Sequence, residues 1–316
     1  MPFWKFQGVG NDFLVVPAER APMRVAELAR RICDRRLGIG ADGLLLVHKL
    51  KKGPVPTMVR IINADGSEAE ISGNGIRCVG AYLLAVSRRS SRQPLLIRTL
   101  AGTKELIPVE VGQRRWVFRV DMGKPVLDPA KIPFQADRAR TPVCGFHLPT
   151  SKGTLPVTVT SMGNPHCSIF VEDFDKIDWV SLGEEIERKP HFPRGTNVEF
   201  IKVVSKREIQ VRYWERGVGV TLSSGTGSCG ATVASILNGH TGRRVRVRTL
   251  AGTMEVEWRP GKSEDEDEPV YLTGPVELIA SGDYWLNTER SGKNRKFSKK
   301  LSPGIKEEKM IRLRER

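Results

Sequence analysis

Two four-residue segments have the composition of a small anion-binding turn. Ser72-Gly73-Asn74-Gly75 and Ser224-Gly225-Thr226-Gly227 each place a serine ahead of a Gly-x-Gly turn, and an apolar helical stretch follows each of them. A serine at this place caps a helix by accepting a hydrogen bond from a backbone N–H of the first turn. The other N–H groups and the helix dipole can bind an anion such as a carboxylate. Capping is the simpler interpretation of either segment alone, and an anion site gains support if the two segments face each other.

The chemistry open to these serines is limited. A hydroxyl is a far weaker acid than a thiol, whose ordinary pKa is about 8.5, and it becomes a base only when another group takes its proton. The helix dipole, worth about 0.3–1 kcal/mol, cannot supply that activation alone. Cys78 and Cys229 follow Ser72 and Ser224 by six and five residues. At about 1.5 Å per residue they lie too far along each helix to replace the serines, and we predict buried core thiols.

The two segments belong to an internal repeat. Residues 98–103 and 248–253 both read Arg-Thr-Leu-Ala-Gly-Thr at an offset of 150, and the Ser-Gly-x-Gly segments are offset by 152. Each copy predicts a strand, a turn, a helix and a hairpin in that order. The chain therefore resembles two copies of one unit.

Local patterns predict the elements that position the turns. Alternation over 208–214 and the β-rich run 196–201 predict strands. The second helix is predicted to end at Asn238-Gly239, because glycine suits a left-handed C-terminal cap. Apolar residues at helical spacing mark one face of each helix: Ile76, Val79, Leu83 and Leu84 in the first, Val233, Ile236 and Leu237 in the second. Together these patterns indicate a mixed α+β fold with much antiparallel sheet.

Length and composition fit a globular protein of two domains. The chain has 316 residues, of which 39% are hydrophobic. It contains no apolar run of the roughly 18–20 residues that cross a bilayer and no secretion signal at its start, so no membrane partner and a cytoplasmic location are expected. The five cysteines form no CxxC pair, and we predict reduced thiols with neither a disulfide framework nor a metal site.

Nearly half of the net charge of +15 lies at one end of the chain. Residues 289–316 carry eleven Lys/Arg against four glutamates, in a polar context that predicts a disordered tail. The acidic run 264–268 is predicted to be a solvated hairpin tip. Because nearly half of the excess charge lies in this tail, nucleic acid is the least favoured partner.

Six further segments share their order and spacing with a known family. They are residues 5–13 (Lys-Phe-Gln-Gly-Val-Gly-Asn-Asp-Phe), 38–43 (Gly-Ile-Gly-Ala-Asp-Gly), 63–68 (Asn-Ala-Asp-Gly-Ser-Glu), 163–166 (Gly-Asn-Pro-His), 197–200 (Asn-Val-Glu-Phe) and 215–219 (Glu-Arg-Gly-Val-Gly) followed by 224–227. Over residues 1–285 the chain resembles the diaminopimelate epimerase family.

The resemblance implies a fold and an activity. It implies two pseudo-symmetric domains, each a mostly antiparallel sheet around a central helix: residues 1–122, then 123–275, with a strand at 276–287 returning to the first domain and a tail at 288–316. It also implies an isomerase of lysine biosynthesis that interconverts LL- and meso-diaminopimelate without pyridoxal phosphate or any other cofactor. The implied partners are a small amino-acid substrate with a free carboxylate and a second copy in a homodimer.

The resemblance also assigns residues to the site. The family's two catalytic cysteines fall at Ser72 and Ser224, and His166 and Glu215 take the places of polar partners to those thiols. Gly73, Asn74, Gly225 and Thr226 would bind the carboxylate of the reacting amino acid. The remaining substrate-binding candidates are Asn11, Asn63, Asn164, Asn197, Glu215 and Arg216.

Serine at both cysteine positions leaves three explanations open. In the first, the serines are engineered replacements that trap an inactive enzyme. In the second, the chain is a natural relative in which His166 and Glu215 support another proton transfer, such as isomerisation or water elimination. In the third, the fold is retained as a catalytically inactive amino-acid-binding protein. Ile71 and Ser223, which precede the two serines, also differ from the residues most common in the family's motifs, and this favours a natural variant.

Overall fold

Two copies of one order of strands and helices make up residues 1–284. The computed structural model describes residues 1–22, 24–87, 92–136, 140–259, 261, 266 and 268–286. Contacts divide the chain into Met1–Tyr284 and Trp285–Arg316, and every helix and strand of the described residues lies in the first of these units. The predicted tail at 288–316 lies outside the described residues, as does most of the acidic run 264–268.

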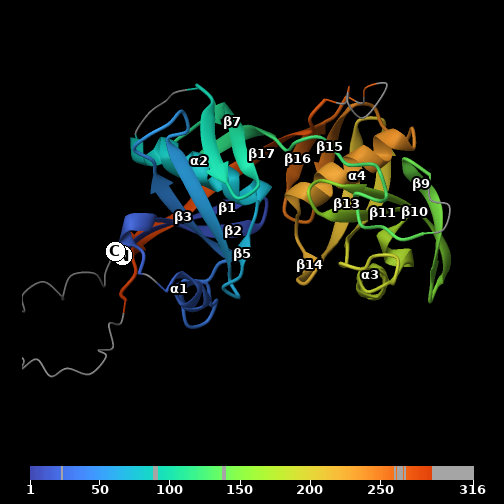
Figure 1. Cartoon of the computed structure of the whole chain (residues 1–316), viewed down its shortest axis with the longest axis horizontal. Helices are drawn as coiled ribbons and strands as arrows, with labels where there is room; N and C mark the ends of the chain where they lie inside the picture. The colour runs from blue at the N-terminus through green and yellow to red at the C-terminus, as the bar shows by residue number, and fades with distance from the viewer. Residues whose placement is uncertain are drawn as a thin grey trace, which may run out of the picture. The chain divides into compact units, whose positions relative to one another are not determined.

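The first copy runs from β1 to β8 (Figure 1). Its elements are β1 (Pro2–Gly8), β2 (Asn11–Pro17), the 3-10 turn η1 (Ala18–Arg20), α1 (Val25–Ile32), β3 (Gly43–Lys49), β4 (Thr57–Asn63), β5 (Glu68–Ala69), α2 (Gly73–Ser87), β6 (Leu95–Thr99), β7 (Gly102–Val111) and β8 (Arg115–Asp121).

The second copy follows the strand β9 (Val143–Thr150) and repeats the same order. Its elements are β10 (Gly153–Ser161), β11 (Pro165–Phe170), the 3-10 turn η2 (Phe174–Lys176), α3 (Trp179–Glu187), β12 (Asn197–Ser205), β13 (Glu208–Glu215), β14 (Gly219–Thr221), α4 (Gly225–Leu237), β15 (Arg244–Arg248), β16 (Thr253–Glu257) and β17 (Tyr271–Asp283). The predicted duplication and both predicted strands, now β12 and β13, are confirmed.

Strand pairing repeats as closely as element order. The pairs β2–β3 and β4–β6 are parallel in the first copy, and β11–β12 and β13–β15 are parallel in the second. Phe13 opposes Gly43 where β2 meets β3, and His166 opposes Asn197 where β11 meets β12. Phe13 is therefore the counterpart of His166, and Gly43 is the counterpart of Asn197. Leu45 and Glu199, which follow Gly43 and Asn197 by two residues, are counterparts as well.

The first copy closes into a barrel around α2. Hydrogen-bonded pairs run β1-β2-β3-β4-β6-β7-β8-β17 and return to β1. In the second copy the ladder β9 to β13, β15, β16 and β17 lies around α4. β17 therefore pairs with strands of both copies. The strands thus form one continuous sheet through β17, and its two parts each surround a central helix, which is the predicted α+β arrangement (Figure 1).

The central helices differ from the predicted one-faced pattern. In α2 every residue from Gly73 to Tyr82 is buried, and in α4 nearly every residue to Ser235 is buried. A helix surrounded by sheet has no solvent face, and small residues let the strands approach it. A Cβ on Gly80 would lie 2.9 Å from Leu106, for example. Of the helices described, none is long and apolar enough to span a membrane.

The repeated hexapeptide forms the same turn twice. Thr99 Oγ1 donates to the carbonyl of Gly102 at 2.9 Å, and Thr249 Oγ1 donates to that of Gly252 at 3.0 Å. Helix α4 ends as predicted, with Gly239 at a φ of +68°. The domain boundaries at 122 and 275 stay a prediction.

Candidate active site

The N-termini of α2 and α4 meet at two glycines. A Cβ on Gly225 would lie 3.6 Å from the Cα of Gly73 and 3.7 Å from Oδ1 of Asn74. Glycine at these places therefore lets the two helix starts come within van der Waals contact. The serines of the two segments cap these helices.

Both caps have the expected geometry. Ser72 Oγ accepts from the N–H of Gly75 at 3.0 Å, and Ser224 Oγ accepts from the N–H of Gly227 at 3.1 Å. The first intrahelical bonds run from Ile76 to the carbonyl of Ser72 and from Ser228 to that of Ser224. The N–H groups of Gly73, Asn74, Gly225 and Thr226 precede those bonds, so their helices offer them no acceptor.

The neighbouring thiols are part of the core. Cys78 and Cys229 have no exposed surface, and burial raises the pKa of each thiol to about 12. They are protonated at neutral pH and lie within the helices, as predicted. Neither can replace the serine that precedes it.

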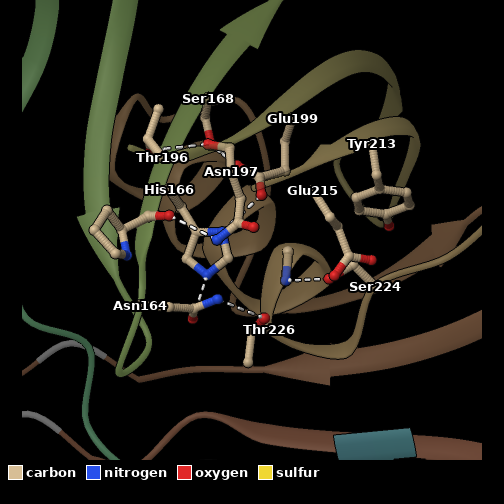
Figure 2. Close-up of polar contacts among 12 residues, drawn as sticks. Asn164, His166, Ser168, Thr196, Asn197, Glu199, Tyr213, Glu215, Ser224 and Thr226 are labelled. Atoms are coloured by element: carbon tan, nitrogen blue, oxygen red, sulfur yellow. Dashed lines mark hydrogen bonds and ion pairs between the residues drawn. The ribbon is translucent and has the colours of Figure 1, made fainter. Parts of the chain in front are cut away.

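A buried acid–base pair lies where β11 and β12 run parallel (Figure 2). His166 Nδ1 lies 2.6 Å from Oε1 of Glu199, and neither side chain has exposed surface. His166 Nε2 lies 3.0 Å from Oδ1 of Asn164, whose Nδ2 donates to Oγ1 of Thr226 at 3.4 Å. A continuous chain of polar contacts thus connects the Glu199 carboxylate with the first turn of α4.

Two buried glutamates near these contacts have raised pKa values. Burial raises the pKa of Glu199, and the neighbouring His166 opposes that rise. Burial also raises the pKa of Glu215, although Thr221 Oγ1 donates to its Oε1 at 2.7 Å and opposes the rise. Carboxyls whose pKa is raised in this way are suited to exchange protons nearer neutrality.

Glu199 is a site residue that the sequence patterns did not single out. Its counterpart in the first copy is Leu45, and the counterpart of His166 is Phe13, both of them buried. The first copy therefore forms with an apolar pair at the place where the second copy has His166 and Glu199. A comparison of the two copies position by position would have found Glu199 as a glutamate where the other copy has leucine.

Asn11 and Asn74 come together in the first copy. Asn74 Nδ2 donates to Oδ1 of Asn11 at 3.3 Å, and Asn11 Nδ2 donates to Oδ2 of Asp42 at 2.5 Å. Asn74 is 3% exposed and Asn11 is partly exposed at the end of the β1–β2 hairpin. Both side chains are therefore held at the start of α2.

The remaining candidates, Asn197, Asn63 and Arg216, have hydrogen-bond partners of their own. Asn197 donates to the carbonyl of Pro165 at 2.8 Å and accepts from the N–H of Arg216 at 3.0 Å. Asn63 is exposed and donates to Ser67 Oγ at 2.9 Å, and the Arg216 guanidinium donates to the carbonyl of Arg194 at 3.0 Å. The substrate roles of these three residues stay predictions. Among the described residues no group of three or more His, Cys, Asp or Glu side chains has the arrangement of a metal site.

Comparison with known proteins decides the family. The sequence profile of the family described as diaminopimelate epimerase matches residues 3–127 and 158–279. The chain is 45% identical over 294 residues to the diaminopimelate epimerase of Pelotomaculum thermopropionicum, covering 91% of this chain and all of that protein. It is 42% identical over 288 residues to that of Desulfitobacterium hafniense, covering 89% and 97%.

The chain belongs to the diaminopimelate epimerase family. It is accordingly an isomerase of the amino-acid epimerase type, as the sequence resemblance implied. A solved structure of a probable proline racemase from Agrobacterium radiobacter, crystallised with carbonate, has the same fold, with a TM-score of 0.67 at 15% identity over 92% of this chain and 94% of that one. The segment 128–157, which holds β9 and the start of β10, falls outside the family match.

Proposed function

We propose that this family member binds diaminopimelate and interconverts its LL and meso forms in lysine biosynthesis, with turnover impaired by serine at positions 72 and 224. The observation that carries the proposal is the meeting of two capped helix N-termini at Gly73 and Gly225. The backbone N–H groups that the two caps leave without an acceptor, together with the two helix dipoles, favour the binding of an amino-acid carboxylate at this point.

The acid–base groups support a proton transfer beside this carboxylate site. A Cβ on Gly227 would lie 3.0 Å both from Ser224 Oγ and from Oε1 of Glu199, so these two oxygens are at most 6.0 Å apart. His166 and Glu199 are thus on the Ser224 side of the site, and Glu215 has a carboxyl with a raised pKa. General acid–base groups of this kind contribute about 10²- to 10⁴-fold to a proton transfer.

Serine is the reason to expect slow turnover. Removal of a weakly acidic α-proton needs a base, and a hydroxyl serves only when another group takes its proton. The hydroxyls of Ser72 and Ser224 each accept a hydrogen bond from the backbone, and no carboxylate or imidazole among the described residues takes a proton from either one. Cysteine at the same places would need no such partner, because a helix N-terminus lowers the pKa of a thiol.

A second candidate is supported by the His166–Glu199 pair and Glu215. These residues could carry out an isomerisation or a water elimination of a small acid without either serine, and the same site without turnover would be an amino-acid-binding protein. We extend the proposal to a homodimer, which the family resemblance implies, and to the cytoplasmic location expected from the sequence; sedimentation of the purified chain would measure its oligomeric state.

Proton exchange in D₂O tests the proposal. LL-diaminopimelate is incubated with three forms: the chain as it stands, Ser72→Cys/Ser224→Cys and Ser72→Ala/Ser224→Ala. We expect slow or absent deuterium incorporation at the α-carbon with serine, fast incorporation with cysteine and none with alanine. Exchange that survives in the alanine form would favour His166 and Glu215 as the bases. Absence of exchange and of binding in all three forms would contradict the diaminopimelate assignment.

A further inference from the structure

Arg77 is a fully buried cation that the site described so far does not use. It lies one turn into α2, with no exposed surface. Its Nη2 donates to Oδ1 of Asn74 at 2.6 Å and lies 3.8 Å from Sδ of Met254, and its Nη1 donates to the carbonyl of Gly73 at 3.3 Å. Its Nε–H has no partner, and in the described part of the chain no carboxylate lies within ion-pair distance of the guanidinium.

A buried charge without a counter-ion is costly to keep. Burial lowers the pKa of Arg77 to about 10, which reflects the cost of removing the cation from water. The counterpart of Arg77 in the second copy, at the 152-residue offset of the two serines, is the uncharged Cys229. The fold therefore does not require a cation at this place.

The backbone around the guanidinium is shaped to admit it. A Cβ on Gly8 would lie 3.4 Å from Nη2, and a Cβ on Gly274 would lie 3.2 Å from Cζ and from Nη2. Gly8 ends β1 and Gly274 lies in β17, so both strands approach the cation through residues without side chains. Larger residues there would press against the guanidinium.

Arg77 fixes the direction of a chain of hydrogen bonds. A guanidinium only donates and an ionised carboxylate only accepts, so the two ends of the series Arg77, Asn74, Asn11 and Asp42 determine how both asparagine amides are turned. Asn74 Oδ1 must point to Arg77, and Asn74 Nδ2 must point to Asn11. At the other end, Asp42 Oδ1 is held by Arg35 Nη2 at 2.6 Å.

The charge lies close to the place where the helices meet. Asn74 Oδ1, which accepts from Arg77, lies 3.7 Å from the position of a Cβ on Gly225. The cation is therefore separated from the first turn of α4 by one side-chain amide. A carboxylate bound at the two helix N-termini would lie on the other side of that amide.

We propose that Arg77 is a positioning residue of this site: it turns the Asn74 amide so that Nδ2 is a donor at the start of α2, and its charge is balanced by the carboxylate of the bound ligand. The second part rests on the proposed function, because it assumes a carboxylate ligand. The first part concerns the ligand-free protein alone.

Three variants test the inference. Arg77→Met fills similar space without charge, Arg77→Lys keeps the charge without the planar fork, and Arg119→Met removes an arginine that is over one-third exposed and lies over the ring of Tyr271. Each is compared with the unaltered chain by thermal unfolding without ligand, by calorimetric titration with LL-diaminopimelate and by amide NMR of the Asn74 side chain, which Asn74→Ala identifies.

The expected results separate positioning from support of the fold. Without ligand, Arg77→Met should unfold within a few degrees of the unaltered chain, because loss of the Asn74 bond is offset by loss of an unbalanced buried charge. Its Asn74 side-chain amide signals should shift and its hydrogens exchange faster, and binding should weaken at least tenfold. Arg77→Lys should bind with an intermediate affinity, and Arg119→Met should bind normally.

Other results would overturn it. Unchanged Asn74 amide signals in Arg77→Met, or binding within threefold of the unaltered chain, would show that Arg77 positions nothing. A large fall of the unfolding temperature without ligand would show a structural role. If the unaltered chain fails to bind LL-diaminopimelate, the proposed function is contradicted, while the unfolding and NMR measurements still decide the role of Arg77.

Discussion

Glu199→Leu tests how much the buried pair of His166 and Glu199 contributes to the stability of the fold. The substitution leaves the Nδ1 side of His166 without its partner at 2.6 Å, in a place with no exposed surface. Removal of one member of a buried charged pair costs about 3–5 kcal/mol, whereas a neutral donor left unpaired costs about 1–3 kcal/mol. We expect a cost within the range that these two values span, at least about 1 kcal/mol, which corresponds to a fall of the unfolding midpoint by roughly 2–20 °C.

A double variant supplies the matched comparison. His166→Phe/Glu199→Leu copies Phe13 and Leu45, which are the counterparts of these residues in the first copy. Because both polar groups are replaced together, no charge is left unpaired, and the double variant should recover most of the stability that Glu199→Leu loses. Glu199→Gln, which keeps an acceptor without the charge, should lie between the unaltered chain and Glu199→Leu.

Urea unfolding at neutral pH measures these differences. Ser168→Ala is the control, because Ser168 Oγ contacts Oε2 of Glu199 only at 3.5 Å, and it should change the free energy of unfolding by less than about 1 kcal/mol. The reasoning fails if Glu199→Leu unfolds with the free energy of the unaltered chain. It also fails if the double variant is as unstable as the single one.

Three further predictions concern the same site. Ser224→Ala should lower the free energy of unfolding by about 0.5–2 kcal/mol, because Ser224 Oγ accepts from Gly227 at 3.1 Å; a loss below about 0.3 kcal/mol in urea unfolding would deny the cap a role. Glu215→Gln should be more stable than the unaltered chain, and the difference in free energy of unfolding should grow as the pH rises above 4.5, the ordinary pKa of a glutamate. The reason is that burial raises the pKa of this carboxyl, so its ionisation destabilises the folded state. Urea unfolding from pH 4 to 8 would contradict this if the difference between the two proteins became smaller with rising pH. Gly230→Ala should cost about 1–3 kcal/mol and disturb the His166 ring, since a Cβ there would lie 2.9 Å from its Cγ; unchanged imidazole NMR signals would refute the prediction.

Local sequence patterns predicted correctly those features that depend on local backbone geometry. The caps at Ser72 and Ser224, the end of α4 at Gly239 and the paired Thr99 and Thr249 turns depend on a few neighbouring residues, and all lie where the sequence placed them. The helices were the exception, because their apolar spacing predicted one buried face and the surrounding sheets bury nearly all of them.

The two serines are now defined as helix caps with known partners. Each hydroxyl accepts a backbone N–H, so what the family resemblance marks as a position of proton transfer is, in this chain, a position of helix capping as well. His166, Glu199 and Glu215 form a separate group, which we propose as the acid–base groups of the second candidate function. The proton-exchange experiment with the alanine form tests whether that group acts without a thiol.

The sequence alone determined the duplication, the caps and the family, because repeats and motifs are properties of residue order. Only the tertiary structure showed that Glu199 lies against His166, 33 residues away in the chain, and that Arg77 is buried near the meeting of α2 and α4 with no carboxylate of the described residues at ion-pair distance. Burial and charge pairing arise when distant strands come into register. A residue's type does not reveal its partners until the sheets around α2 and α4 have formed.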